Sequence, residues 1–198
     1  MAEAATADET AVKASGVRLR RATAADLDAI AALEALAFPP TEAAPRTAYA
    51  DRLATYPEHI LLAVAEDGAV DAEGVAGTEK PAGTGTLLAF VVALATNRRD
   101  LADDMFADAS IHDPDGDWLM ILSVASHPGH RGAGHPTALL RLLIDDARRE
   151  GRTGLVLTCK AAKLGYYARL GFIDEGVSAE SEHGGEEWNQ MRLVLDAE

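Results

Sequence analysis

The chain has 198 residues, of which 48% are hydrophobic and 25% charged, as expected for a globular protein with a substantial core. Its formal net charge of −14 argues against nucleic acid, which proteins bind through cationic contacts to phosphate, and suits a cationic small molecule. A single cysteine, Cys159, excludes an internal disulfide, and no apolar run is long enough to span a membrane, so we expect a cytoplasmic protein.

Residues 1–15 have neither the basic start nor the apolar core of a secretory signal, and we expect a disordered tail followed by one domain over 16–198. The spacing of Thr23 and Asp26 resembles a capping box, and Pro39-Pro40 ends the helix that begins there. Residues 67–85 have little to bury and predict a long connection between two strands.

Short apolar or alternating runs predict strands at 17–20, 59–65, 86–94, 119–124, 155–158, from 172 onward, and at 188–195. Helices are predicted from the Thr23 cap to Phe38, and over 43–56, 101–109, 136–150 and 161–170. The second of these is expected to be interrupted, or to begin, near Pro45. This order of elements predicts one α/β domain with a mixed sheet.

The most informative stretch follows the strand at 119–124. Pro128-Gly129 closes that strand, and the basic, glycine-rich turn Arg131–Gly134 leads directly into a helix. Unpaired N–H groups and the positive end of the helix dipole then point at one spot, which suits a phosphate. The helix has an apolar face of Leu139, Leu140, Leu143, Ile144 and Ala147.

This turn resembles the pyrophosphate loop of the GNAT acyltransferases, whose pattern is Arg/Gln-x-x-Gly-x-Gly/Ala. Here the pattern reads Arg131-x-x-Gly134-x-Pro136, so a proline stands where the family has Gly or Ala. Proline fits the first helical position but has no N–H to give to a phosphate. We therefore expect somewhat weaker acetyl-CoA binding, not its loss.

Three further stretches resemble the same family, and in particular its arylalkylamine N-acetyltransferases. They are residues 157–172, which contain Tyr166-Tyr167-x-x-x-Gly171-Phe172, residues 34–44 around Phe38-Pro39-Pro40, and residues 183–191. The resemblance spans about residues 17 to 195. It implies the GNAT fold, with about seven strands and helices on both faces, and acetyl transfer from acetyl-CoA to an amine in a ternary complex.

The resemblance also implies a cofactor site at the end of the central strand, where the strands splay and a main-chain N–H polarises the thioester carbonyl. The implied contacts to pantetheine are Val124, Ala125 and Ser126, and those to the pyrophosphate are Arg131, Gly132, Ala133, Gly134, His135, Pro136 and Thr137.

Amine acetylation needs a group that protonates the leaving thiolate, and a tyrosine can do so. Tyr167 occupies the position of this general acid in the family. Judged from the residues alone, it reads as a core tyrosine beside Tyr166 whose hydroxyl merely finds a partner. With the resemblance, we favour Tyr167 as the acid.

The base is less evident, because Met120 and Leu122 stand where vertebrate-type relatives carry two histidines. Glu42 lines up with a glutamate that acts through water in insect relatives. It is either this base or a solvated carboxylate in an acidic loop. Glu34 is a weaker candidate and reads as a charge on a helix face.

The remaining reactive side chains predict no metal site. Three histidines, His127, His130 and His135, crowd the turn and are expected to donate to CoA phosphates rather than to bind zinc. His59 and His183 are expected at the surface or at a strand edge. Other expectations are a buried, unreactive Cys159, and Trp188 and Met191 in the core of the last strand, with an aromatic wall of the substrate site as the alternative.

Three functions remain open from the sequence. The first is an acetyl-CoA-dependent N-acetyltransferase acting on small primary amines such as arylalkylamines. The second keeps the fold and makes the acceptor a protein lysine or N-terminus. The third is a non-catalytic acyl-CoA-binding sensor, to which Pro136 and the missing histidines lend weight. We expect a monomer or a homodimer.

Overall fold

A computed structural model describes residues 16–66, 85–182 and 185–195. The predicted tail at 1–15, nearly all of the predicted connection at 67–85, and His183 lie outside the described residues. None of the described helices is long and apolar enough to cross a membrane.

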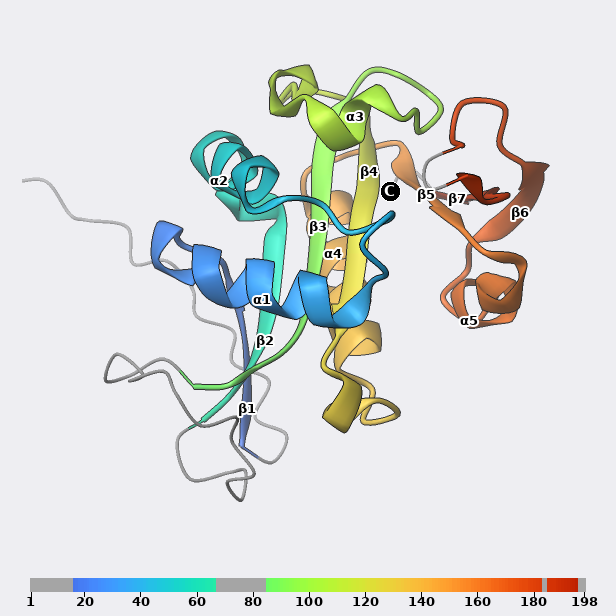
Figure 1. The fold of residues 1–198 in the computed structure, drawn as a ribbon. Coiled ribbons are helices and arrows are strands. Elements are labelled where there is room, and N and C mark those ends of the chain that lie inside the picture. Colours follow the sequence, from blue (N-terminus) through green and yellow to red (C-terminus); the bar gives the residue numbers. More distant parts are fainter. Residues whose placement is uncertain (1–15, 67–84, 183–184, 196–198) are drawn as a thin grey trace, which may run out of the picture.

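The described residues form a sheet of seven strands in the order β1-β2-β3-β4-β5-β7-β6 (Figure 1). Its only parallel pair is β4 with β5, and the other neighbours run antiparallel, so the predicted mixed sheet is confirmed. The strands are β1 Val17–Arg21, β2 Ile60–Ala65, β3 Leu87–Thr96, β4 Trp118–Ser126, β5 Gly154–Cys159, β6 Ile173–Val177 and β7 Asn189–Val194.

The predicted helices are present, and two are shorter than expected. The described α-helices are α1 Leu27–Ala37, α2 Arg46–Thr55, α3 Asp104–Ala107, α4 His135–Arg149 and α5 Leu164–Ala168. The one predicted over 101–109 stops early because the Asp108 side chain accepts a hydrogen bond from the Ser110 N–H and starts a separate 3-10 turn. The one predicted over 161–170 begins with a 3-10 turn and stops before Gly171, where φ is 95°.

The start of α1 follows the predicted capping box. The Thr23 N–H donates to Asp26 Oδ2 over 2.8 Å, and Arg20 forms an ion pair with the same carboxylate at 2.6 Å. Pro45 immediately precedes α2, where its fixed φ suits the entry to a helix. Short-range chemistry therefore sets these two boundaries.

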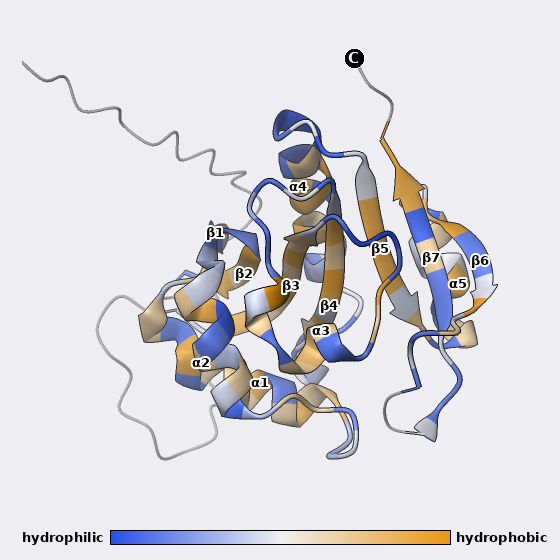
Figure 2. Cartoon of the chain, turned by 90° about the horizontal axis from the view of Figure 1, so that it is seen from above, coloured by the Kyte–Doolittle hydropathy of each residue, from blue (hydrophilic) through white to orange (hydrophobic). Residues whose placement is uncertain are grey.

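Two hydrophobic layers enclose the sheet. One joins it to α4 and α5, and the other joins it to α1, α2 and α3. Figure 1 shows α1 and α2 in front of the sheet and α4 behind it, so helices cover both faces as predicted. Hydrophobic residues are concentrated in the central strands β3, β4 and β5, whereas hydrophilic residues dominate the loops around them (Figure 2).

The central strand β4 is irregular near its C-terminal end. The β3–β4 register shifts between Val92 and Ala93, so that Leu122 forms a bulge in β4. Parallel pairing with β5 ends at Ile121, opposite Leu157. Beyond that pair, β4 stays bonded to β3 and β5 to β7, so the two facing edges no longer pair with each other.

Candidate active site

The turn after β4 is open to solvent and has the backbone geometry of an anion-binding loop. Gly132 and Gly134 have φ of 82° and 84°, a backbone conformation that residues with a side chain rarely adopt. A Cβ placed on either glycine would meet no atom within 4 Å. Glycine is therefore required by the backbone conformation rather than by a close neighbour, and space is left above the loop for a ligand.

Helix α4 begins at the end of this turn, with Gly134 as its N-cap and His135 as its first residue. Pro136 is consequently the second helical residue, not the first as predicted. Its missing N–H is still one of those that a helix start leaves unpaired, so the expected loss of one phosphate contact is unchanged. The Thr137 hydroxyl lies 3.1 Å from the Tyr166 hydroxyl, which links this helix start to α5.

Two of the three histidines of the turn have lowered pKa values. Burial, and then His130, lower the pKa of both His127 and His135, which keeps these rings neutral near pH 7. The His127 ring accepts a hydrogen bond from the Gly129 N–H over 3.2 Å. Arg131 adds an exposed guanidinium, which is a charge available to a phosphate.

The strand residues that should meet pantetheine lie beyond the last β4–β5 pair. Val124 and Ser126 are half-buried and Ala125 is buried. The Ser126 hydroxyl is enclosed and has no hydrogen-bond partner among the described residues. A strand edge with unpaired backbone groups, such as that of β4 beyond Ile121, is suited to bind an extended ligand as an additional strand.

Tyr167 belongs to α5 and packs into the hydrophobic layer on that side of the sheet, where it is 8% exposed. Its ring packs edge-on against Tyr166 at 4.9 Å and Phe172 at 6.1 Å between centroids. Burial raises the pKa of Tyr167, so its hydroxyl stays protonated and can donate a hydrogen bond or a proton. Cys159 is also buried, and burial raises its pKa to about 11, which leaves an unreactive thiol.

Glu42 is not a solvated carboxylate. Its side chain is 8% exposed and accepts a hydrogen bond from Lys160 Nζ over 2.7 Å. The same ammonium lies 3.8 Å from Glu186 and 5.6 Å from the centre of the Trp188 ring. These four residues, Glu42, Lys160, Glu186 and Trp188, form what we call the acceptor wall, beside the end of β5.

Glu34 was expected to be a charge on a helix face, and that prediction is wrong. It is 3% exposed and accepts hydrogen bonds from the Ala44 N–H at 3.0 Å and the Ser123 hydroxyl at 3.1 Å. Burial raises the pKa of its carboxyl, and the bond from Ala44 opposes that rise. Periodicity along α1 could not reveal this, because both partners come from other elements.

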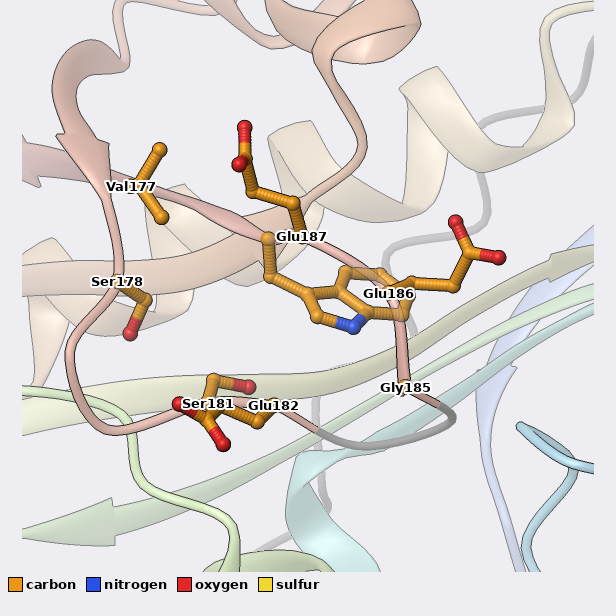
Figure 3. A pocket seen from close by; sticks show the side chains of 8 residues that line it. Val177, Ser178, Ser181, Glu182, Gly185, Glu186 and Glu187 are labelled. Atoms are coloured by element: carbon orange, nitrogen blue, oxygen red, sulfur yellow. The ribbon is translucent and has the colours of Figure 1, made fainter.

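A pocket of about 350 Å³ lies between the end of β6 and the start of β7. Asp103 holds its rim, since its carboxylate accepts from the Ser181 hydroxyl and from the Glu182 N–H, each at 3.0 Å. Trp188 is buried, as predicted, and also lines the pocket. The polar and aromatic residues that line it include Ser181, Glu182, Glu186, Glu187 and Trp188 (Figure 3).

Among the described residues, one group of potential metal ligands, Glu58, His59 and His112, has its ligand atoms within 4.8 Å of one another. His112 Nδ1 accepts a hydrogen bond from the Ala95 N–H over 3.1 Å, so the ring hydrogen lies on Nε2 and no lone pair is left there for a metal. His59 is 3% exposed and lies 3.4 Å from Glu150, so its predicted surface position is wrong.

Residues 27–172 match the Acetyltransferase (GNAT) family, and this range includes the turn, α4, β5 and Tyr167. The chain therefore belongs to the GNAT acetyltransferase family. A search of curated protein sequences finds no match to this chain.

Solved structures with the same fold include enzymes of several kinds. GphF, a GNAT-like decarboxylase in complex with isobutyryl-CoA, is 21% identical, with a TM-score of 0.68 over 90% of this chain and 100% of that chain. The yncA protein from Salmonella typhimurium, a putative acetyltransferase with acetyl-CoA, is 22% identical, with a TM-score of 0.57 over 91% and 95%. The ribosomal-protein-S18-alanine N-acetyltransferase from Escherichia coli is 17% identical, with a TM-score of 0.58 over 92% and 96%. At these identities the likeness shows the fold alone.

Proposed function

We propose that the protein transfers the acetyl group of acetyl-CoA to a small primary amine by direct attack in a ternary complex. Acetyl-CoA is the co-substrate, as the sequence predicts. The observation that carries the proposal is the divergence of β4 and β5 beyond Ile121 and Leu157, with an open glycine turn at one end. The acceptor wall adjoins the same divergence, because Lys160 directly follows β5.

The cofactor would lie along the free edge of β4. Val124, Ala125 and Ser126 would bind pantetheine through their backbone, and the main-chain N–H groups of the turn and of the start of α4 would bind the pyrophosphate. Arg131 would add a charged contact. One strand N–H pointing at the thioester carbonyl would stabilise the oxyanion that forms when the amine attacks.

The proton balance assigns two further roles. The bound ammonium first loses one proton to solvent, because only the neutral amine can attack. The amine nitrogen then forms the new C–N bond and gives up a second proton through a water molecule to the Glu42 carboxylate, which releases it to solvent. The C–S bond then breaks, and the Tyr167 hydroxyl protonates the leaving thiolate and is itself reprotonated from solvent. Lys160 Nζ donates a hydrogen bond to the Glu42 carboxylate and so holds it in place beside the end of β5.

The acceptor proposed is a cationic amine, with arylalkylamines as the first candidates because of the resemblance in the sequence. Glu182, Glu186 and Glu187 line the pocket beside the acceptor wall, and Trp188 supplies an aromatic surface there. Carboxylates attract an ammonium, and an indole face attracts both cations and aromatic rings. A lysine side chain or a peptide N-terminus shares this chemistry and is the alternative acceptor.

The test measures CoA thiol release from acetyl-CoA across arylalkylamines, polyamines, lysine peptides and peptides with free N-termini. Saturable thiol release with small amines would support the proposal. Release only with peptides would show that the acceptor is a peptide and not a small amine. Tight CoA binding, measured by calorimetry, without release on any amine would instead establish a non-catalytic acyl-CoA sensor.

A further inference from the structure

The Glu34 carboxylate links three segments that are distant in the sequence. It projects from α1, and its Oε1 accepts from the Ala44 N–H over 3.0 Å. Its Oε2 accepts from the Ser123 hydroxyl over 3.1 Å, across 89 residues of chain. At 3% exposure it has almost no contact with solvent, so these protein contacts replace its hydration.

One end of this linkage determines where Glu42 lies. The N–H groups of Glu42 and Ala43 both donate to the Pro39 carbonyl, at 2.9 and 3.0 Å, and so close a tight turn after α1. Ala44 follows directly and is held by Glu34. The bond to Ala44 thus lies two residues from Glu42, which itself accepts from Lys160 Nζ over 2.7 Å.

The other end of the linkage lies on the cofactor strand. Ser123 directly follows the Leu122 bulge and directly precedes Val124, the first residue proposed to meet pantetheine. It is buried at 7% exposure, and it lies opposite Val92 of β3 in the register. The face of β4 toward α1 is therefore bonded to α1 through Ser123, two residues after the last pair between β4 and β5.

We propose that Glu34 is a positioning residue that holds the acceptor wall at a set distance from the cofactor strand, through its paired bonds to Ala44 and Ser123. The proposal rests on the proposed function, since the groups it positions are those assigned to the amine and the cofactor. It concerns hydrogen bonding and not proton transfer, so an uncharged side chain of the same shape should serve.

The experiment compares Glu34→Ala with Glu34→Gln. A glutamine can accept from the Ala44 N–H with its carbonyl and donate to the Ser123 hydroxyl with its amide, and so replaces both contacts. We expect Glu34→Ala to lower kcat/KM for the amine about 100-fold, because small displacements of reacting groups have effects of that size. Glu34→Gln should stay within about threefold of the wild type, and the acetyl-CoA Kd should change less than about twofold in both.

Asp28→Asn is the matched control, because Asp28 also lies on α1 and bonds Arg46 of α2, but on the exposed surface. It should not change the kinetics. A Glu34→Gln variant as inactive as Glu34→Ala would overturn the proposal and make the charge itself essential. An equal loss of acetyl-CoA affinity and of amine kcat/KM in Glu34→Ala would also overturn it, since the effect would then be general.

Two measurements keep the inference separate from the proposed function and from folding. Hydrogen exchange at the Ala44 amide should be slow in the wild type and Glu34→Gln and fast in Glu34→Ala, whether or not any amine is acetylated. If Glu34→Ala does not fold, Ser123→Ala removes the strand contact alone. It should lower amine kcat/KM about tenfold with the acetyl-CoA Kd unchanged, and unchanged kinetics would contradict the proposal.

Discussion

The two halves of the candidate site are built in opposite ways. The turn proposed to bind the pyrophosphate, residues 127–137, is one continuous segment, exposed or half-buried throughout, whose conformation comes from its own glycines. The acceptor wall comes from the turn after α1, the end of β5 and the segment before β7, and is held by contacts such as that of Glu42 with Lys160, 118 residues apart.

This difference suggests a division of labour between the two proposed regions. A continuous loop that binds through main-chain N–H groups recognises the pyrophosphate of any acyl-CoA. In a wall assembled from three distant segments, a single residue can be substituted without disturbing the binding of the cofactor. Variants in the two regions should therefore affect different kinetic constants.

The largest effect is expected at Tyr167, which bears on the chemistry and on neither binding region. Tyr167→Phe removes the proposed proton donor and should lower kcat about 100-fold or more, with the acetyl-CoA Kd unchanged. Thiol release and calorimetry measure the two quantities. Tyr166→Phe is the control, because its hydroxyl bonds Thr137, and it should lower kcat far less. Equal losses in the two variants would remove Tyr167 from the mechanism.

The next largest effect is expected from Gly134→Ala, which should weaken cofactor binding alone. Gly134→Ala places a Cβ at φ 84°, which costs about 1–2 kcal/mol, and we expect the exposed turn to relax out of the binding conformation. CoA affinity, measured by calorimetry, should fall about tenfold. Gly151→Ala carries the same strain, at φ 70° after α4, and should lower the Tm without changing CoA affinity.

Lys160→Met disrupts the acceptor wall and leaves the cofactor turn intact. It leaves the Glu42 carboxylate, which is mostly buried, without its ammonium partner. Since Lys160 itself is 41% exposed, the effect should be modest, about fivefold in amine kcat/KM, with the acetyl-CoA Kd unchanged. Steady-state kinetics at saturating acetyl-CoA measure it. A loss confined to acetyl-CoA binding would contradict the division between the two regions.

A gain is expected from Pro136→Ala, which restores one N–H in the first turn of α4. One additional hydrogen bond to a phosphate should contribute about 1 kcal/mol and tighten acetyl-CoA binding about fivefold. The amine KM should not change. Calorimetry that finds equal or weaker binding would show that the proline does not limit the cofactor site.

The smallest effect lies outside both regions and tests the electrostatics of the scaffold. His59, and also Arg152, hold the pKa of Glu150 at about 2, below its ordinary value of 4.5. Because the folded state lowers this pKa, the stabilisation is present above about pH 4.5 and disappears as the pH falls to about 2.

Glu150→Gln should therefore lower the Tm at pH 6, and its difference from the wild type should shrink in acid. Asp145→Asn, which removes an exposed pair with Arg148, should show almost no difference at any pH. A difference for Glu150→Gln that stays constant down to pH 2 would contradict the assigned pKa.

The sequence by itself determined the fold and the backbone geometry of the turn that is proposed to bind the pyrophosphate. Apolar runs, Pro39-Pro40 and the Thr23 cap act within a few residues of chain, so their elements appear in the structure where expected. The turn at Arg131–Gly134 belongs to the same class, because positive φ at glycine and the unpaired N–H groups of a helix start are local properties.

Only the tertiary structure decided which polar side chains are buried and what they bond. Glu34 and His59 read as surface groups along the chain, yet both are enclosed, since their partners Ser123 and Glu150 come from other elements. Glu42 likewise acquires Lys160 only when β5 lies beside the turn after α1. The burial of a charge depends on what packs over it, and that neighbour is far away in sequence.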